Sequence, residues 1–251
     1  MTPLFEKEFA VQYYETDQRG FARPVALLNY LQSAAGDHAA LLGVAVADLR
    51  KSGHTWVLSR LHLAMERYPR VGDTVRIRTW PVSRLNLFTV RDFELFDGKG
   101  ELLGRATTSW AVLNLKTRRP VQLAGVLPLY SLHPERALND AFSTLPQLEQ
   151  PEYELRLPVL RSDLDINRHV NNTVYAGWAL ETIPDEVDDT CRLASIEIGF
   201  RAEALYGDTI IARTARTVDA GCYLHCIENG SDGRELTRLR TRWIFPAGTF
   251  H

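Results

Sequence analysis

The sequence predicts an α+β protein made of two copies of one unit, each a curved antiparallel sheet wrapped around a central helix. Two observations predict it. Related segments recur in the same order in both halves of the 251 residues. In each half a polar loop leads into an apolar, helix-like segment, and strand-like segments follow. A single helix followed by a long antiparallel meander buries its apolar surface best if the sheet curls around the helix.

The repeat is visible at two separate places. Gly-Asp-Thr stands at residues 72–74 and again at residues 207–209, an offset of 135 residues (207 minus 72). A Thr-x-Trp sequence ends at Trp110 and again at Trp243, an offset of 133 residues (243 minus 110). Two matches at nearly equal offsets make chance similarity a weak explanation, so we interpret the halves as copies of one supersecondary unit.

The elements of the first half follow in order. A polar loop around Asp17 leads into residues 24–36, with a continuation past His38, a segment that is apolar nearly all round and typical of a buried helix. Residues 75–80 alternate between apolar and polar side chains, which predicts a strand. The Asp-Gly pair at 97–98 then favours a hairpin.

The second half repeats this order. A polar loop at 163–165 precedes a helix-like segment at 174–183, which is expected to stop at Pro184 because proline cannot continue a helix. Two alternating strand patterns and a second hairpin signal follow, at 196–198, 238–243 and the Asn-Gly pair 229–230.

A proline-rich connection separates the two halves. Residues 117–158 hold six of the twelve prolines, which predicts a linker that crosses the surface. We therefore expect an N-terminal domain over residues 1–120, a linker over 121–150 and a C-terminal domain over 151–251.

The composition excludes several classes of protein. A hydrophobic content of 45% and a charged content of 24% are typical of a soluble globular protein, and a net charge of -2 argues against a general nucleic-acid binder. The N-terminus has no signal-peptide or transit-peptide pattern, and no run of about eighteen apolar residues predicts a membrane span. The three cysteines form no disulfide framework, so a cytoplasmic location is expected.

Cys222, His225 and Cys226 are close enough in sequence to suggest a metal site. Residues 221–227 have a strand pattern, however, and a strand would hold the two cysteines about 13 Å apart with the imidazole on the other face. No metal is therefore expected at these residues. No cofactor is expected for the chain either.

The densest polar cluster lies within residues 161–178. Polar residues alternate there with other side chains, so an extended conformation would place four of them on one face: Asp163, Asp165, Asn167 and His169. Carboxylate, amide and imidazole groups before a helix N-terminus suit a site that polarises a carbonyl group and moves a proton. Helix capping is the competing explanation. It accounts well for Asn171 or Asn172 but not for His169.

Residues 163–172, followed by Tyr175, Trp178 and Glu181, closely resemble the signature of the acyl-ACP thioesterases of plants and their bacterial relatives. The resemblance spans the whole chain, including the tandem halves and the proline-bearing linker. It implies two tandem hotdog domains, each a curved antiparallel sheet around a helix. It also implies hydrolysis of the thioester that joins a fatty acyl chain to acyl carrier protein, and so a role in fatty acid biosynthesis.

The resemblance assigns four catalytic residues. Asp165, Asn167 and His169 match polar residues of the family's site, and Glu203 falls where the family has a catalytic glutamate. The next position is a cysteine in many plant members and is Ala204 here. This departure argues against a cysteine nucleophile and for direct attack by water.

Each of these residues has an expected role. Glu203 is the expected general base, with His169 sharing or orienting the water. Asn167 and N–H groups near residues 170–172 would donate to the carbonyl oxygen, and Asp165 would hold His169 or Asn167 in orientation. The leaving thiol, with a pKa of about 8.5, needs little help from an acid.

The first half is expected to be catalytically reduced. Asp17 lies in an Asp-x-x-Gly sequence like that of single-domain hotdog acyl-CoA thioesterases, which makes it a rival to Glu203 as the catalytic carboxylate. Gly20 and Phe21, however, stand where the second half has His169 and its neighbours. This half could then shape an acyl pocket, although plain core packing also explains the candidate lining residues: Leu27, Leu31, Ala35 and Trp56.

The implied partner, acyl carrier protein, is acidic, so a basic docking patch is expected. The candidates are one strand face and two shorter basic pairs: Arg238, Arg240 and Arg242; Arg118 and Arg119; Arg50 and Lys51. An acyl-CoA thioesterase and a non-catalytic sensor of acyl thioesters remain open as alternatives, while a hydratase of the same fold would need a 2-enoyl substrate. Two fused hotdog units are compatible with a monomer or a homodimer.

Overall fold

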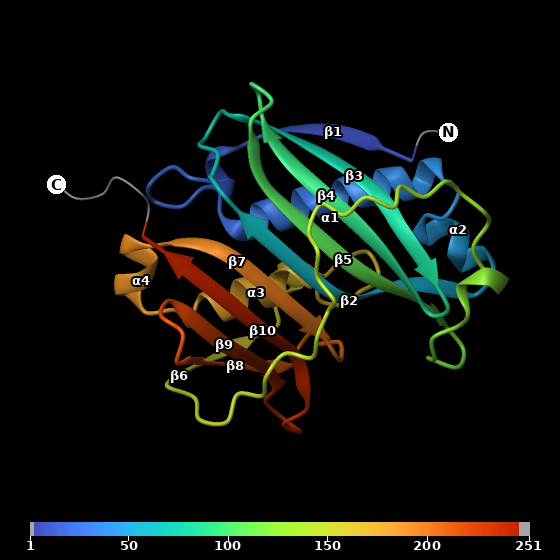
Figure 1. Ribbon diagram of the computed structural model, residues 1–251. Coiled ribbons are helices and arrows are strands. Elements are labelled where there is room, and N and C mark those ends of the chain that lie inside the picture. The colour runs from blue at the N-terminus through green and yellow to red at the C-terminus, as the bar shows by residue number, and fades with distance from the viewer. Residues whose placement is uncertain (1–2, 246–251) are drawn as a thin grey trace. The chain divides into compact units, whose positions relative to one another are not determined.

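The computed structural model describes residues 3–245 and divides the chain into two compact units, Met1–Ala141 and Phe142–His251. The division falls inside the segment expected as a linker. Each unit contains one antiparallel sheet and one principal helix, α1 in the first and α3 in the second (Figure 1).

The N-terminal unit begins with a short strand, passes through α1 and ends with a meander. Its strands hydrogen-bond in the order β1-β3-β4-β5-β2, each pair antiparallel. Helix α1 packs against β1 and β3, and α2 packs against β2. The elements are β1 (Phe5–Ala10), η1 (Tyr13–Glu15), α1 (Pro24–Leu41), α2 (Val46–Lys51), β2 (His54–Met65), β3 (Thr74–Leu85), β4 (Phe88–Asp97), β5 (Leu102–Asn114) and η2 (Leu123–Gly125), where η marks a 3₁₀ helix.

The C-terminal unit has the same topology. Its strands pair in the order β6-β8-β9-β10-β7, again antiparallel throughout, and α3 packs against β8, β9 and β10. The elements are β6 (Tyr153–Pro158), η3 (Arg161–Asp163), α3 (Asn172–Leu180), α4 (Asp185–Thr190), β7 (Arg192–Phe200), β8 (Thr209–Arg216), β9 (Cys222–Asn229) and β10 (Glu235–Ile244).

The predicted duplication is confirmed strand by strand, because β1 to β5 correspond in order to β6 to β10. The correspondence extends to side chains. Trp110 donates its indole N–H to Thr108 at 2.9 Å, and Trp243 donates to Thr241 at 3.1 Å. Gly72 and Gly207 also share a left-handed backbone (φ +84° and +88°), so both sequence matches mark the same local structure twice.

Burial of the helix against its own sheet stabilises each unit. In the N-terminal unit Leu27 and Leu31 of α1 are at most 1% exposed, as are Ile77, Phe93 and Leu95 of the sheet. Complete burial of such a side chain stabilises a fold by roughly 2 kcal/mol. Within residues 3–245, no helix is both long enough and apolar enough to cross a membrane.

The helices differ in extent from the sequence expectation. Helix α1 does continue past His38 and ends at Leu41. Helix α3 begins two residues earlier than expected, at Asn172, and already ends at Leu180. The Thr182 hydroxyl donates to the carbonyl of Ala179 at 2.7 Å in the following turn. Pro184 was expected to end α3, but it lies directly before α4. Proline disfavours helical backbone at the residue before it, so α3 ends ahead of Ile183.

Both predicted hairpins form, between β4 and β5 and between β9 and β10. The connections are longer than two-residue turns, however. The glycines with left-handed backbone are Gly100 (φ +86°) and Gly233 (φ +70°) rather than the glycines at 98 and 230. In the first hairpin Asp97 accepts the N–H groups of Lys99 and Glu101, both at 2.9 Å, which fixes the turn.

The linker contains little regular structure, but residues 133–140, which we call the strap, are fastened to the N-terminal unit. The N–H of His133 donates to Pro81 at 2.9 Å. Trp80 donates its indole N–H to the carbonyl of Glu135 at 2.9 Å. Arg136 pairs with Asp92, which is completely buried, at 2.9 Å. The first part of the linker is therefore built into this unit.

Candidate active site

Asp165, Asn167 and His169 lie on a tight turn between η3 and α3. The Asp165 carboxylate organises this turn. Its Oδ1 accepts the backbone N–H groups of Asn167 at 2.7 Å and His169 at 3.2 Å, and its Oδ2 accepts the side-chain amide of Asn167 at 2.9 Å. The N–H of Asp165 donates to the carbonyl of His169 at 2.8 Å. One carboxylate thus fixes both neighbours, which is a common use of aspartate in turns.

The extended conformation expected for residues 163–169 is wrong. Asp163 belongs to η3, and its carboxylate accepts the N–H of Leu160 at 2.7 Å instead of joining the other polar groups. Arg168 has a left-handed backbone (φ +64°), which reverses the chain before His169. Strand-like alternation therefore does not describe this segment, and the polar groups meet through the turn.

Asp165 holds the two neighbours in different ways. It contacts the side chain of Asn167, as expected, but it reaches His169 through the main chain and not through the imidazole. The carboxylate therefore orients an amide and a loop. It does not reproduce the aspartate–imidazole contact of a catalytic triad.

Glu203 reaches this turn from the segment that follows β7. The N–H of Val170 donates to the carbonyl of Ala204 at 3.3 Å, and His169 forms an isolated bridge with Leu205. These contacts place Glu203 Oε2 3.6 Å from His169 Nε2. The two side chains are 43% and 32% exposed, so water reaches both. This separation is longer than that of a direct hydrogen bond.

The N-terminus of α3 is capped by the side chain of its own N-cap residue, Asn171. The Asn171 side chain accepts the N–H of Thr173 at 3.4 Å, so the capping explanation is correct for this asparagine. Of the three N–H groups expected near the carbonyl oxygen, that of Val170 donates to Ala204 and that of Asn171 donates to Asp163 at 2.8 Å. Asn172 is therefore the remaining candidate donor of this trio.

The N-terminal unit contains the same turn without the imidazole. Asp17 accepts the N–H groups of Arg19 and Phe21, both at 2.9 Å, and its own N–H donates to the carbonyl of Phe21 at 2.8 Å. Gly20 has the left-handed backbone (φ +79°) that Arg168 has in the other unit. Phe21 therefore occupies the position of His169 on an equivalent scaffold.

The candidate pocket residues pack within the N-terminal unit. Leu27, Leu31 and Ala35 are buried. Trp56 donates its indole N–H to the carbonyl of Val44 at 2.7 Å. It packs against a core cluster formed by Val44, Leu49, Val112, Leu123 and Leu127. Part of the linker thus completes the core around Trp56.

The basic strand face of β10 is smaller than expected. Arg238 is buried, donates to the carbonyl of Leu145 at 2.7 Å and pairs with Glu235 at 2.7 Å, so it is wrong as a docking residue. Arg240 is exposed and pairs with Glu197 at 2.6 Å, and Arg242 is exposed. The linker therefore contacts the face of β10 at Arg238, through the carbonyl of Leu145.

The strand predicted around Cys222, His225 and Cys226 is confirmed as β9. The His225 imidazole is completely buried, with Nδ1 2.6 Å from Thr214 Oγ1 and Nε2 2.8 Å from Thr241 Oγ1. Both ring nitrogens are therefore engaged within the core. Burial lowers the pKa of His225 to about 3 and raises the pKa of Cys226 to about 12, so both groups are neutral near pH 7.

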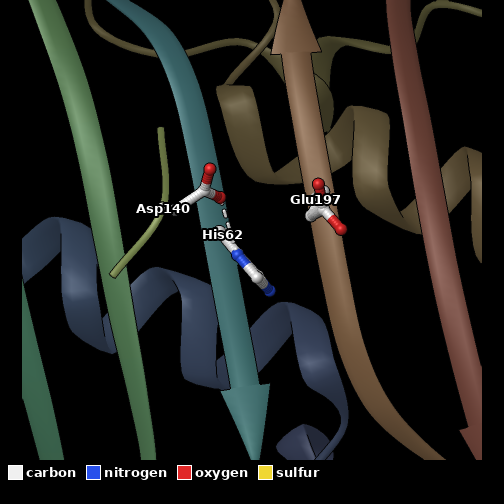
Figure 2. A group of neighbouring side chains, drawn as sticks. All are labelled: His62, Asp140 and Glu197. Atoms are coloured by element: carbon white, nitrogen blue, oxygen red, sulfur yellow. Dashed lines mark hydrogen bonds and ion pairs between the residues drawn. The ribbon is translucent and has the colours of Figure 1, made fainter. Parts of the chain in front are cut away.

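One polar pair in the N-terminal unit gave no signal in the sequence. His62 Nδ1 lies 2.7 Å from Asp140 Oδ2, joining β2 to the strap, as Figure 2 shows. The two residues are 78 positions apart in the chain, so only the fold brings them together. Figure 2 also draws Glu197 of β7, the partner of Arg240.

Comparison with known proteins agrees with this fold. The model of the acyl-ACP thioesterase N-terminal domain matches residues 2–126, and that of the C-terminal domain matches residues 147–245. A chloroplastic oleoyl-acyl carrier protein thioesterase of Arabidopsis thaliana is 32% identical over 95% of this chain and 75% of its own length.

Two solved structures are similar over nearly the full length of both chains. An acyl-ACP thioesterase from Bacteroides thetaiotaomicron has a TM-score of 0.86 and 27% identity, covering 96% of this chain and 98% of its own. A 12:0-ACP thioesterase from Umbellularia californica has a TM-score of 0.86 and 27% identity, covering 98% of each chain.

The duplicated units are tandem hotdog domains, and the fold is that of a thioester hydrolase. The chain belongs to the acyl-ACP thioesterase family.

Proposed function

We propose that this protein hydrolyses the thioester of fatty acyl-ACP by direct attack of water and releases a free fatty acid and holo-ACP. One observation carries the proposal. An imidazole and a carboxylate from separate segments, His169 and Glu203, lie 3.6 Å apart beside an amide that Asp165 holds in place. Membership of a family whose plant members are named for oleoyl- and dodecanoyl-ACP supports the substrate class.

Glu203 is the proposed general base, and His169 orients the water or shares its proton. As Glu203 takes a proton, the water oxygen bonds to the acyl carbon and the carbonyl oxygen becomes an oxyanion. The Asn167 amide has two N–H groups, of which one donates to Asp165. In the transition state the Asn167 amide and the N–H of Asn172 would donate to the oxyanion. The C–S bond then breaks, and the leaving thiolate takes up the proton.

Ala204 supports attack by water. The residue beside Glu203 has no nucleophilic side chain, and it is completely buried. The three cysteines, Cys191, Cys222 and Cys226, are elsewhere in the C-terminal unit, on β9 or directly before β7. A covalent acyl-cysteine intermediate has no candidate nucleophile at the proposed site.

We propose different tasks for the two domains. The N-terminal domain has the turn around Asp17 but carries Phe21 in place of the imidazole, which supports a role in holding the acyl chain. The C-terminal domain carries the four proposed catalytic residues. The cytoplasm is the proposed location, because a reducing compartment suits a chain whose cysteines are all free thiols.

The test measures thiol release from a chain-length panel of acyl-ACP esters and from the matching acyl-CoA esters. Wild type should prefer the acyl-ACP esters. His169→Ala and Glu203→Gln should each lower kcat about 10²-fold or more, as loss of a general base does. Glu186→Gln, an exposed glutamate on α4, is the matched control and should leave kcat unchanged.

Each alternative predicts a different result. Turnover of acyl-CoA esters alone would assign the other carrier. If neither ester is hydrolysed, the protein is a sensor of acyl thioesters rather than a hydrolase. A Glu203→Gln enzyme with near-normal turnover would contradict the assignment of the base.

A further inference from the structure

Both backbone polar groups of Ala204 form hydrogen bonds with residues that follow His169 in the chain. Its carbonyl accepts the N–H of Val170 at 3.3 Å, and its N–H donates to the phenolic oxygen of Tyr175 at 2.8 Å. Tyr175 lies on α3 and is 3% exposed. The Ala204 N–H belongs to the peptide that joins Glu203 to Ala204, so the Tyr175 hydrogen bond holds that peptide, and the Val170 hydrogen bond holds the next one.

The tyrosine ring is itself held in place. It forms T-shaped contacts with the rings of Trp178 and Phe200, whose centroids lie 5.2 Å and 6.0 Å from its own. Burial raises the pKa of Tyr175 to about 12, so the phenol stays neutral in the physiological range. The hydroxyl oxygen is therefore a fixed and uncharged acceptor for the Ala204 N–H.

The duplicated unit provides an internal comparison. The N-terminal unit repeats the hydrogen bond between Val170 and Ala204, because the N–H of Ala22 donates to the carbonyl of Pro69 at 2.9 Å. Pro69 corresponds to Ala204 but has no N–H. The position of Tyr175 on the helix corresponds to Leu27 of α1, which has no hydroxyl. Donor and acceptor are both missing from the N-terminal copy.

The catalytic pair is missing from the same copy. Phe21 corresponds to His169, and Tyr68 corresponds to Glu203. The tyrosine–amide hydrogen bond therefore occurs in the copy that has the imidazole and carboxylate, and not in the copy that lacks them. A hydrogen bond needed only to hold a hotdog unit together would be expected in both copies.

We propose that Tyr175 is a positioning residue that acts through the Ala204 amide and sets the place of the Glu203 carboxylate relative to His169. The proposal rests on the proposed hydrolysis and deepens it. Loss of the hydroxyl would leave the Ala204 N–H without its acceptor and allow the segment around Glu203 to shift. A displacement of about 1 Å at a catalytic group costs on the order of 10²-fold in rate.

The first experiment is Tyr175→Phe, which removes one oxygen atom and keeps the ring. We expect kcat for acyl-ACP to fall about tenfold to a hundredfold, while KM changes less than about twofold. The same substitution made in Glu203→Gln should lower the residual rate, measured in single turnover, by less than about twofold. An unchanged kcat in Tyr175→Phe, or an equal loss in both backgrounds, would overturn the proposal.

The second measurement does not depend on activity. Amide hydrogen exchange of Ala204, followed by NMR, should become at least about tenfold faster in Tyr175→Phe. If it does so while wild type hydrolyses no thioester, the contact is real but the proposed function fails. If wild type is active and the exchange rate of Ala204 does not change, the positioning role fails.

Tyr30→Phe is the matched control in the other unit. Tyr30 is also a buried helix tyrosine, and its hydroxyl donates to Glu15 at 2.5 Å. This variant should lose some stability, keep kcat within about twofold and leave the exchange rate of Ala204 unchanged. A loss of kcat equal to that of Tyr175→Phe would show a general effect of removing a buried hydroxyl and would overturn the proposal.

Discussion

The Asp165 carboxylate binds Asn167 twice, at its backbone N–H at 2.7 Å and at its side-chain amide at 2.9 Å. The second contact directs the Asn167 side chain, and the first shapes the turn that presents it. A carboxylate that served only as a negative charge would not need both of these contacts. Asp165 is thus the structural centre of the turn that carries His169.

Asp165→Ala should therefore lower both activity and stability. Loss of three hydrogen bonds to a charged acceptor is expected to cost about 2–4 kcal/mol in the free energy of unfolding, and kcat should fall at least about tenfold. Urea denaturation and thiol release measure the two effects. Asp17→Ala removes the equivalent carboxylate from the N-terminal unit and should lower stability with much less effect on kcat. A larger loss of kcat in Asp17→Ala would favour the rival site.

Arg168 and Gly20 allow a test of backbone strain. Both have a left-handed φ, which costs a non-glycine residue about 1 kcal/mol. Arg168→Gly should raise the free energy of unfolding by about 0.5–1 kcal/mol. Gly20→Ala should lower it by about 1 kcal/mol, and because a Cβ at Gly20 would meet open space, the whole cost would come from the backbone. Thermal unfolding measures both changes, and equal signs would contradict this account.

His225 should make the protein sensitive to acid. Burial lowers its pKa to about 3 in the folded state, against an ordinary value near 6.5. Between these values the unfolded chain binds a proton that the folded chain does not, so stability is complete above about pH 6.5 and falls as the pH decreases. The slope is about 1.4 kcal/mol per pH unit for one histidine.

The check is urea denaturation of wild type and His225→Gln at pH 7, 6 and 5. The variant should lose stability less steeply by about that slope. Its remaining slope should include His38, whose pKa is lowered to about 4 mainly by burial and also by Arg91, and which acts in the same direction. Parallel pH curves for the two proteins would exclude His225 as a source of acid sensitivity.

The ion pair between Asp92 and Arg136 should anchor the strap. Asp92 is completely buried, so Arg136→Leu would remove the only arginine partner that the described residues give it and should cost about 3 kcal/mol. Arg105→Leu removes a largely exposed pair with Glu66 and should cost about 0–1 kcal/mol. Equal effects in denaturant titrations would show that the strap does not depend on the buried pair.

The sequence predicted the repeat well because duplicated sequence carries duplicated local structure. The Gly-Asp-Thr and Thr-x-Trp matches mark equivalent turns and indole hydrogen bonds in both units. It failed for residues 163–169, where alternation indicated a strand. Alternation cannot register the 3₁₀ turn at Asp163 or the left-handed backbone of Arg168, because these features go with hydrogen bonds from nearby backbone N–H groups to two separate carboxylates, those of Asp163 and Asp165.

By itself the sequence determined the fold class, the family and which residue types stand at the proposed site, since these are properties of order and spacing along the chain. The tertiary structure decided how those residues meet. It brought Glu203 to His169 across 34 positions, joined Tyr175 to Ala204 and buried Arg238. Such contacts depend on the register in which separate segments pair and on which side chains are buried by other segments. The local sequence pattern determines neither.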